Sequence, residues 1–213
     1  MREYTARPER NASAVVSVGE ESDEELASRV GGGDRLAAGA LVARHADRIF
    51  ATCYRMLGER AAAEDAAQET FMRLWKHASR WRPRGAKLET WLYRIAMNVC
   101  LDMLRRRKRM MSNAETVAFE RADETPSALE RIEANQTRAA VAAALAALPE
   151  RQRAAIVLCH YQELSNIDAA AALDVSVEAV ESLLSRARRS LREKLLSQRD
   201  ELLEGARHGA ANL

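Results

Sequence analysis

Apolar residues recur every three or four positions along most of the chain, as they do on the buried face of an α-helix. The longest such stripe is Val177, Val180, Leu184, Ala187 and Leu191. The same spacing predicts helices over 36–57, 60–77, 136–147 and 150–161, and another from Leu88 onwards. A heavy load of Ala, Leu, Glu and Arg favours helix over sheet, and nine Gly and four Pro are too few for an all-β protein with many turns. The pattern therefore predicts an all-α fold.

A short helix after Ser165 and the helix that carries the long apolar stripe are close enough in the sequence to form a helix-turn-helix. Ser165 is placed to cap a short helix, with Asp168 at the position that completes a capping box. The helix breaks at Asp174, a residue type that tolerates the left-handed backbone of a tight turn, and Ser176 caps the next helix. The face opposite the apolar stripe bears groups suited to base edges and phosphates: Glu178, Glu181, Ser182, Ser185, Arg189 and Arg192. An ordinary helical hairpin with a solvated polar face is the alternative.

The first half of the chain also contains signals for where helices begin and end. Ser22 and Glu25 form a predicted capping box that opens a short helix, which Gly31 to Gly33 end. The triple glycine is not a phosphate loop, because no Gly-Lys-Ser/Thr follows it. The predicted helix 60–77 has a second face, opposite its apolar stripe, that carries Asp65, Gln68, Glu69 and Met72. This face is either solvated or a docking surface for a polar partner.

Charge is unevenly distributed although the formal net charge is only +2. Between Arg80 and Arg109 there are ten Lys or Arg residues against two acids, whereas residues 110–136 hold six acids against two Arg residues. Trp91 and Tyr93 stand among the cations on the outer faces of the helix that begins at Leu88. Aromatic rings among cations are typical of surfaces that bind single-stranded nucleic acid. Burial of Trp91 in the core is the alternative.

These patterns divide the chain into two small helical domains joined by a flexible linker. We expect a disordered tail over 1–20, a first domain over 21–112, an acidic linker over 113–135, a helix-turn-helix domain over 136–204 and a second tail over 205–213. Three separated cysteines without a CxxC motif indicate reduced thiols rather than a zinc site or disulfides. No apolar run reaches the length of a membrane span, and the N-terminus lacks a signal peptide. We therefore expect a cytoplasmic protein without membrane insertion, metal or cofactor.

Three blocks of the sequence resemble the extracytoplasmic-function sigma factors, the small two-domain initiation subunits of bacterial RNA polymerase. The blocks are RAAAEDAAQETFMRLW, LETWLYRIAMNVCLDMLRRRKR and LPERQRAAIVLCHYQELSNIDAAAALDVSVEAVESLLSRARRSLRE. They occur in the order and at the separations of the family. Together with DEELASRVGGGD, the resemblance extends over about residues 21–196.

The resemblance implies a role for each surface. The face with Asp65, Gln68, Glu69 and Met72 would dock on the clamp coiled coil of core RNA polymerase. The −10 promoter element would meet a specificity loop and a melting helix, with Arg80, Trp81, Arg82, Arg84, Lys87, Trp91, Tyr93, Arg94, Asn98, Arg105 and Arg106. The −35 element would meet the recognition helix, with Ser176, Glu178, Glu181, Ser182, Ser185, Arg186 and Arg189. That helix would also meet the polymerase flap, and an anti-sigma factor is a further implied partner.

Two positions depart from the family pattern. A basic residue is common where Glu181 stands, so the −35 sequence cannot be carried over from relatives. Since a carboxylate near phosphates would be repelled, Glu181 would instead accept a hydrogen bond from the amino group of cytosine. Asp174 stands where glycine is frequent in the turn.

Other classes of protein explain less of the sequence. A helix-turn-helix regulator that acts without polymerase would not need the 60–109 block. An enzyme acting on nucleic acid would need a metal-binding carboxylate cluster, an activated nucleophile or a phosphate loop, and none of these patterns occurs. A helical adaptor that binds only proteins would not need five consecutive cations at 105–109.

Overall fold

A computed structural model describes residues 21–81, 87–113 and 129–210, and these residues form helices and turns without any strand. The first half contains α2 (Asp23–Gly31), α3 (Arg35–Leu57), α4 (Arg60–His77), the short 3-10 turn η1 (Ala78–Arg80) and α5 (Leu88–Asn113). The second half contains α6 (Leu129–Ala146), α7 (Glu150–Ile156), the π-helical turn η2 (Val157–Tyr161), α8 (Asn166–Leu173) and α9 (Val177–Ala210). The expected all-α fold is confirmed.

Several predicted helix ends have the expected caps. The Ser22 hydroxyl accepts from the Glu25 amide at 3.2 Å, and the Glu25 carboxylate accepts in return from the Ser22 amide at 2.8 Å. Gly58 ends α3 with a φ of 74° in the left-handed region, where glycine avoids the steric cost that other residues have. Two other helix ends differ from those expected. Helix α6 begins at Leu129 rather than near Gln136, and α9 continues to Ala210, beyond the expected end near Glu204.

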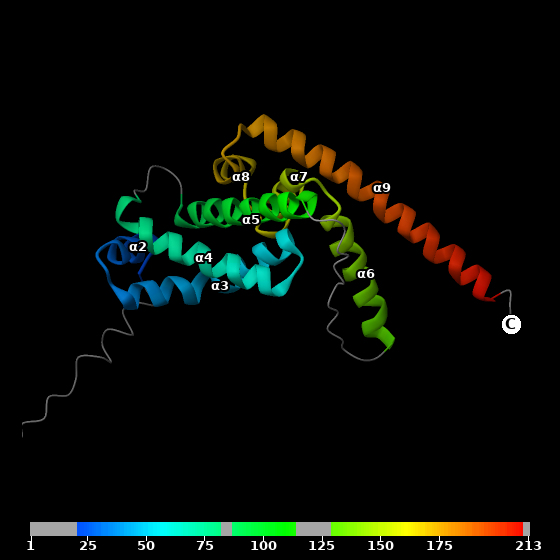
Figure 1. Cartoon of the computed structure of the whole chain (residues 1–213), viewed down its shortest axis with the longest axis horizontal. Coiled ribbons are helices and arrows are strands. Elements are labelled where there is room, and N and C mark those ends of the chain that lie inside the picture. The colour runs from blue at the N-terminus through cyan, green and yellow to red at the C-terminus, as the bar shows by residue number, and fades with distance from the viewer. Residues whose placement is uncertain (1–20, 82–86, 114–128, 211–213) are drawn as a thin grey trace, which may run out of the picture.

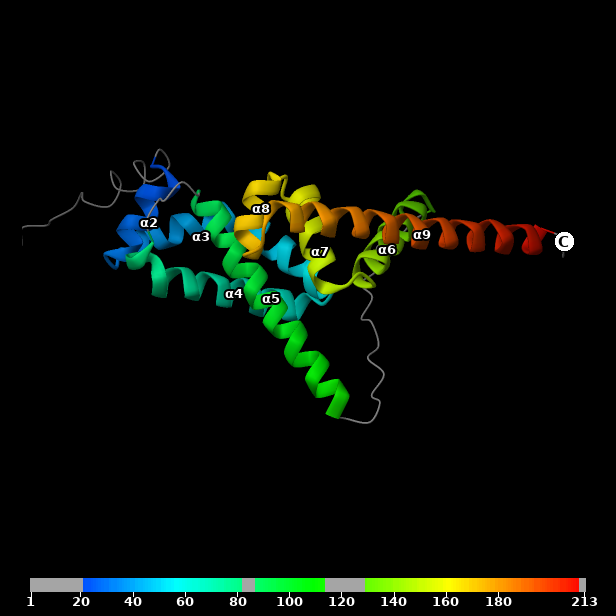
Figure 2. The ribbon, with the colours of Figure 1, turned by 90° about the horizontal axis from the view of Figure 1, so that it is seen from above.

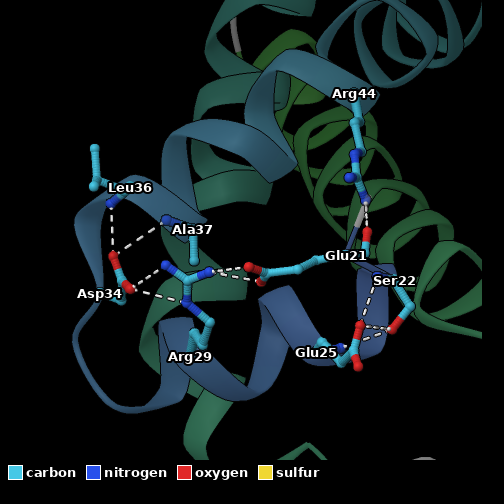
Figure 3. A network of polar contacts seen from close by, with 8 residues as sticks. All are labelled: Glu21, Ser22, Glu25, Arg29, Asp34, Leu36, Ala37 and Arg44. Atoms are coloured by element: carbon cyan, nitrogen blue, oxygen red, sulfur yellow. Dashed lines mark hydrogen bonds and ion pairs between the residues drawn. The ribbon is translucent and has the colours of Figure 1, made fainter. Parts of the chain in front are cut away.

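The start of the fold is held by a network around Arg29 (Figure 3). The Arg29 guanidinium pairs with Glu21 at 2.5 Å and with Asp34 at 2.7 Å. Asp34 is also the N-cap of α3, because its carboxylate accepts from the amides of Leu36 and Ala37. The bond to Arg29 and those backbone amides hold the pKa of Asp34 below its ordinary value. The network therefore joins the end of α2 to the beginning of α3.

Helices α2 to α5 pack around one apolar interior. Helices α3 and α4 lie side by side, and α5 packs across both of them (Figure 1). Their largest fully buried side chains include Leu41, Ile49, Leu74 and Leu92. Gly31 allows α2 to approach η1 closely, since a Cβ at this position would lie 2.9 Å from the Cα of Ser79.

The second half packs against the first rather than standing apart from it. Buried residues of both halves form one hydrophobic cluster that extends along the chain from Leu26 to Ala187. Helix α8 lies on α5, whereas α6 and the long α9 extend away from the first half (Figures 1 and 2). The expected linker lies largely at 114–128, outside the described residues, so the packing is defined by the helices on either side of it.

A buried arginine on α7 connects three helices. Arg153 is 8% exposed and donates to the carbonyl of Met56, near the end of α3, at 2.5 Å. It also donates to the carbonyls of Ala146, the last residue of α6, and Leu148. Burial lowers the pKa of this guanidinium. Because the last carbonyls of a helix have no partner within the helix, Arg153 satisfies acceptors that burial would otherwise leave unpaired.

Replacing Arg153 with Met should destabilise the protein, because the side-chain volume is retained while the buried carbonyls lose their donor. A hydrogen bond to a charged group contributes about 1.5–3 kcal/mol, so the free energy of unfolding should fall by at least that amount. Urea denaturation followed by circular dichroism measures the change. Arg151→Met, an exposed position on the same helix, is the matched control and should stay within about 0.5 kcal/mol of the parent. Equal stability of the two variants would contradict this role of Arg153.

Candidate nucleic-acid interface

The C-terminal part of α5 presents the basic run to solvent. Its exposed cations and their neighbours line an open depression of about 610 Å³: Asp102, Arg105, Arg106, Lys108, Arg109, Ser112 and Glu150. Arg105 pairs with Asp102 at 3.4 Å, and Arg107 lies 3.9 Å from Glu59. Exposed pairs of this kind contribute little free energy and exchange easily for other anions. The depression is therefore suited to phosphate groups.

Two tryptophans lie at the other end of α5, on either side of its N-terminus. Trp81 and Trp91 are both half-buried against the core, with ring centroids 6.2 Å apart and planes tilted by 30°. Arg80 and Lys87 beside them are exposed, whereas Arg82 and Arg84 lie outside the described residues. Trp91 thus combines the two roles that its position in the sequence left open: it packs on the core and keeps part of its surface accessible.

Tyr93 lies in a different environment from the one its position in the sequence predicts. It is 1% exposed, not on an outer face, and its hydroxyl donates to Gln162 Oε1 of the second half at 2.8 Å. Burial, with a smaller effect from the Glu89 carboxylate, raises the pKa of Tyr93 well above its ordinary value. Tyr93 lies three, four and seven positions before Ala96, Met97 and Cys100, which are all buried, so helical spacing could have indicated its burial. The bond to Gln162, 69 positions later, has no local signal.

Arg94 and Asn98 lie on the exposed side of α5, as predicted. Arg94 is nevertheless engaged, because its guanidinium pairs with the Asp174 carboxylate at 3.0 Å. Asp174 belongs to the turn of the helix-turn-helix. Arg94, which was predicted to bind the −10 element, is therefore bonded to the helix-turn-helix, which was predicted to bind the −35 element.

The outer face of α4 is polar at one end and apolar at the other. Asp65 and Gln68 are exposed, and Glu69 is partly exposed and pairs with Arg73 at 2.7 Å. Met72 is 45% exposed, and Trp75, one turn further along, is 44% exposed. Trp75 was not predicted as a member of this face, although its spacing from Gln68 and Met72 places it there. An exposed tryptophan and methionine beside carboxylates are typical of protein–protein interfaces.

The predicted helix-turn-helix is present in α8 and α9. Ser165 accepts from the Asp168 amide at 3.1 Å, and Ser176 accepts from the Ala179 amide at 3.2 Å. Asp174 has a φ of 55°, the left-handed conformation expected for the turn. Helix α8 packs through Ala169, Ala170 and Ala172, whereas Ile167 is 71% exposed. The apolar stripe of α9 is buried as predicted, most completely at Val180, Leu184 and Ala187.

The predicted recognition face of α9 is open to solvent. Glu181, Ser185, Arg186 and Arg189 are exposed, and Ser182 is half-buried. Ser176 and Glu178 have a further role at the start of the helix. Bonds from its own amide and from Ser176 lower the pKa of Glu178, which keeps a negative charge at the positive end of the helix.

Two other kinds of site find no support in the described part of the chain. No group of three or more His, Cys, Asp or Glu residues there could hold a metal ion, and Cys53 and Cys100 are buried as free thiols. None of the described helices is both long and apolar enough to cross a membrane. The surfaces that remain are the basic depression, the α4 face and the recognition face.

The fold and these surfaces define a helical DNA-binding protein with a basic, aromatic-bearing helix in one half and a helix-turn-helix in the other. Comparison with protein families matches "Sigma-70 region 2" to residues 41–110 and "Sigma-70, region 4" to residues 138–191. The chain is 33% identical to SigW, an ECF RNA polymerase sigma factor of Bacillus subtilis, over 76% of this chain and 91% of SigW. It belongs to the extracytoplasmic-function sigma factors of RNA polymerase, which are transcription initiation factors.

Other relatives extend the comparison. SigE of Mycolicibacterium smegmatis is 36% identical over 78% of this chain, which covers only 64% of the length of SigE. The structure of CnrH in complex with the cytosolic domain of CnrY has a TM-score of 0.63 and 30% identity, over 83% of this chain and 99% of CnrH. RpoE of Bartonella quintana, in complex with the anti-sigma factor NepR, has a TM-score of 0.56 and 27% identity, over 72% and 93%.

Proposed function

We propose that this chain binds core RNA polymerase, recognises a −35 and a −10 promoter element, and assists promoter opening. The observation that carries the proposal is the presence, in one sigma-family chain, of three distinct exposed surfaces on α4, α5 and α9. The protein would act in the cytoplasm and perform no covalent chemistry. Binding free energy alone would drive its part in promoter opening.

The α4 face is the proposed polymerase contact. Asp65, Gln68 and Glu69 supply charge and hydrogen-bonding groups, and Met72 with Trp75 supply apolar area that is costly to leave in water. Such a mixed surface fits a helical partner with basic and apolar residues. The clamp coiled coil of the polymerase, named by the family resemblance, is the partner that we assign to it.

Helix α5 and the segment before it form the proposed −10 surface. The basic depression would hold phosphates, and the accessible part of Trp91 would stack on an unpaired base. Stacking contributes about 1–3 kcal/mol per base, which is comparable with the few kcal/mol needed to unstack and flip one. Unpaired DNA would therefore be captured as the duplex opens, rather than forced apart.

Helix α9 is the proposed reader of the −35 duplex. Its exposed groups, Glu181, Ser185, Arg186 and Arg189, are at helical spacing on one face and fit the major groove. The solved complexes of CnrH and RpoE contain their protein partners CnrY and NepR. By analogy, an anti-sigma factor is a further proposed partner of this chain, and it would compete with polymerase for these surfaces.

The polymerase assignment is tested by transcription with purified core enzyme. Wild-type protein should direct initiation, and the double variant Asp65→Arg/Gln68→Arg should lose polymerase affinity at least tenfold, about 1.4 kcal/mol, because it reverses the charge of the face. The melting temperature should stay nearly unchanged, since both residues are exposed. Asp47→Arg, an exposed reversal on α3, is the matched control. If the double variant binds like the control, the α4 face is not the contact.

The role of Trp91 is tested in the assembled holoenzyme. Trp91→Ala should reduce the amount of open promoter complex by the equivalent of about 1–3 kcal/mol, because one stacking partner is lost. Permanganate reactivity of unpaired thymines measures opening, and thermal unfolding of each variant reports its stability. Trp91→Phe retains an aromatic face and should keep most of the opening. A stable Trp91→Ala variant with normal opening would restrict Trp91 to packing.

The role of Glu181 is tested with a promoter library randomised over the −35 element. If Glu181 accepts from cytosine, Glu181→Gln should relax the preference at one base pair by about 1–3 kcal/mol and leave the other positions unchanged. Glu193→Gln, an exposed acid further along α9, is the matched control for the loss of charge. A uniform change at all positions would mean that Glu181 acts only through its charge or faces polymerase.

A further inference from the structure

Helix α2 is firmly attached to the first half, although none of the three proposed surfaces lies on it. At its beginning, the Asp23 carboxylate accepts from Arg44 at 2.9 Å and is bonded to His45 Nε2 at 2.7 Å. At its other end, Arg29 joins α2 to the start of α3 through Asp34 (Figure 3). Both ends of α2 are therefore fixed on α3, and the proposed function does not explain what this rigid helix is for.

The main neighbour of α2 besides α3 is the 3-10 turn η1, which follows α4 (Figure 1). The two elements meet at Gly31, the last residue of α2. A Cβ on Gly31 would lie 2.9 Å from the Cα of Ser79, 3.0 Å from its nitrogen and 3.2 Å from the carbonyl carbon of Ala78. All three are backbone atoms, so no side-chain rotation can make room for a Cβ. Any residue other than glycine would push η1 away from α2.

A displacement of η1 would reach two residues that we assign to the −10 element. The Trp81 amide donates to the carbonyl of Ala78 at 3.1 Å, so the residue that meets Gly31 also holds the backbone of Trp81. The ring of Trp81 lies against that of Trp91, with centroids 6.2 Å apart. Arg80, which is exposed, is the last residue of η1. The position of η1 on α2 therefore determines where this part of the −10 surface lies.

The displacement would be large enough to affect recognition. Contacts of a Cβ are usually 3.4 Å or longer, so even alanine at position 31 would move the backbone of η1 by about 0.5 Å. A binding site has to be held within about 0.5 Å of its productive geometry. Alanine would by itself stabilise the helix more than glycine does. The close approach to η1 is what glycine makes possible at this position.

We propose that Gly31 is a positioning residue for the −10 surface: because it has no side chain, α2 holds η1 at the distance that places Trp81 against Trp91. This inference rests on the proposed function of α5 and the segment before it. Gly31 would not touch DNA, since it acts through the backbone of η1. Its replacement should therefore impair promoter opening and −10 recognition, and leave polymerase binding and −35 recognition intact.

Transcription with core polymerase tests the inference in the full-length chain. Gly31→Ala should form holoenzyme and keep the −35 preference of the wild type. The amount of open promoter complex, measured by permanganate reactivity, should fall about threefold or more, because stacking on an unpaired base is weakened. A promoter library randomised over the −10 element should show a relaxed preference. Gly39→Ala is the matched control, since a Cβ there would meet nothing within 4 Å.

The two tryptophans give a second readout that needs no polymerase. The chain has three tryptophans, so in a Trp75→Phe background the tryptophan bands of the near-ultraviolet circular dichroism come from Trp81 and Trp91 alone. Gly31→Ala should change the intensity of these bands in the folded protein. Ile49→Val, which removes one buried methylene from α3, lowers stability without adding bulk at η1 and should leave the bands unchanged.

A second variant decides the question if Gly31→Ala does not fold. Arg29→Gln removes the ion pairs with Glu21 and Asp34 and so loosens α2 from α3, while Gly31 stays in place. It should change the tryptophan bands and reduce promoter opening in the same direction as Gly31→Ala. Arg151→Gln, the same substitution at an exposed position of α7, is its control and should change neither.

The outcomes separate this inference from the proposed function. If the wild type does not direct transcription, the proposed function is wrong and Gly31 has no −10 surface to position. If the wild type is active and Gly31→Ala opens promoters like Gly39→Ala, only the inference is wrong. Tryptophan bands that stay unchanged, or equal losses of polymerase binding, −35 preference and opening, would also overturn it, because Gly31 would then support only the fold.

Discussion

The arrangement of the two halves depends on a buried cation. Arg153 has to be hydrogen-bonded because desolvation makes an unpaired guanidinium very costly. The acceptors that it finds are carbonyls at the ends of α3 and α6, which have no partner within their own helices. The two terminal nitrogens of Arg153 and the carbonyls therefore offset much of each other's desolvation cost, whereas Arg153 Nε is buried without a partner. Since α7 leads through η2 to α8, fixing α7 on α3 also determines where the helix-turn-helix can lie relative to α5.

Two residues that we propose to contact the −10 element are bonded to the second half of the chain. Arg94 pairs with Asp174 and the Tyr93 hydroxyl donates to Gln162, so each would have to leave this partner to contact DNA. Such competition makes the state of the protein depend on what binds it, because any partner that prefers separated halves shifts the population toward them. The exposed ion pair contributes little free energy, and the buried tyrosine contributes more, so the contact combines salt-sensitive and salt-insensitive parts.

The exposure of the candidate site residues could be predicted well where they lie on one face of a single helix. Asp65 and Gln68 on α4, and Glu181 and Arg186 on α9, are exposed on the faces that helical spacing indicates. Trp75 was not predicted, although the same spacing places it beside Met72 on the exposed face. The burial of Tyr93 could have been found from its spacing to Ala96 and Met97, but its bond to Gln162 could not, because no local pattern connects residues 69 positions apart.

The sequence by itself determined the helices, their caps and the turn at Asp174, because these depend on interactions between residues a few positions apart. It also determined the family, because three motifs stand in order along the chain. The tertiary structure alone decided that the halves share one hydrophobic cluster, that Arg153 connects α7 to α3, and that Asp174 faces Arg94. Those contacts join residues that are about 80 to 100 positions apart. Periodicity shows which face of a helix is apolar, but it does not show which distant surface covers that face.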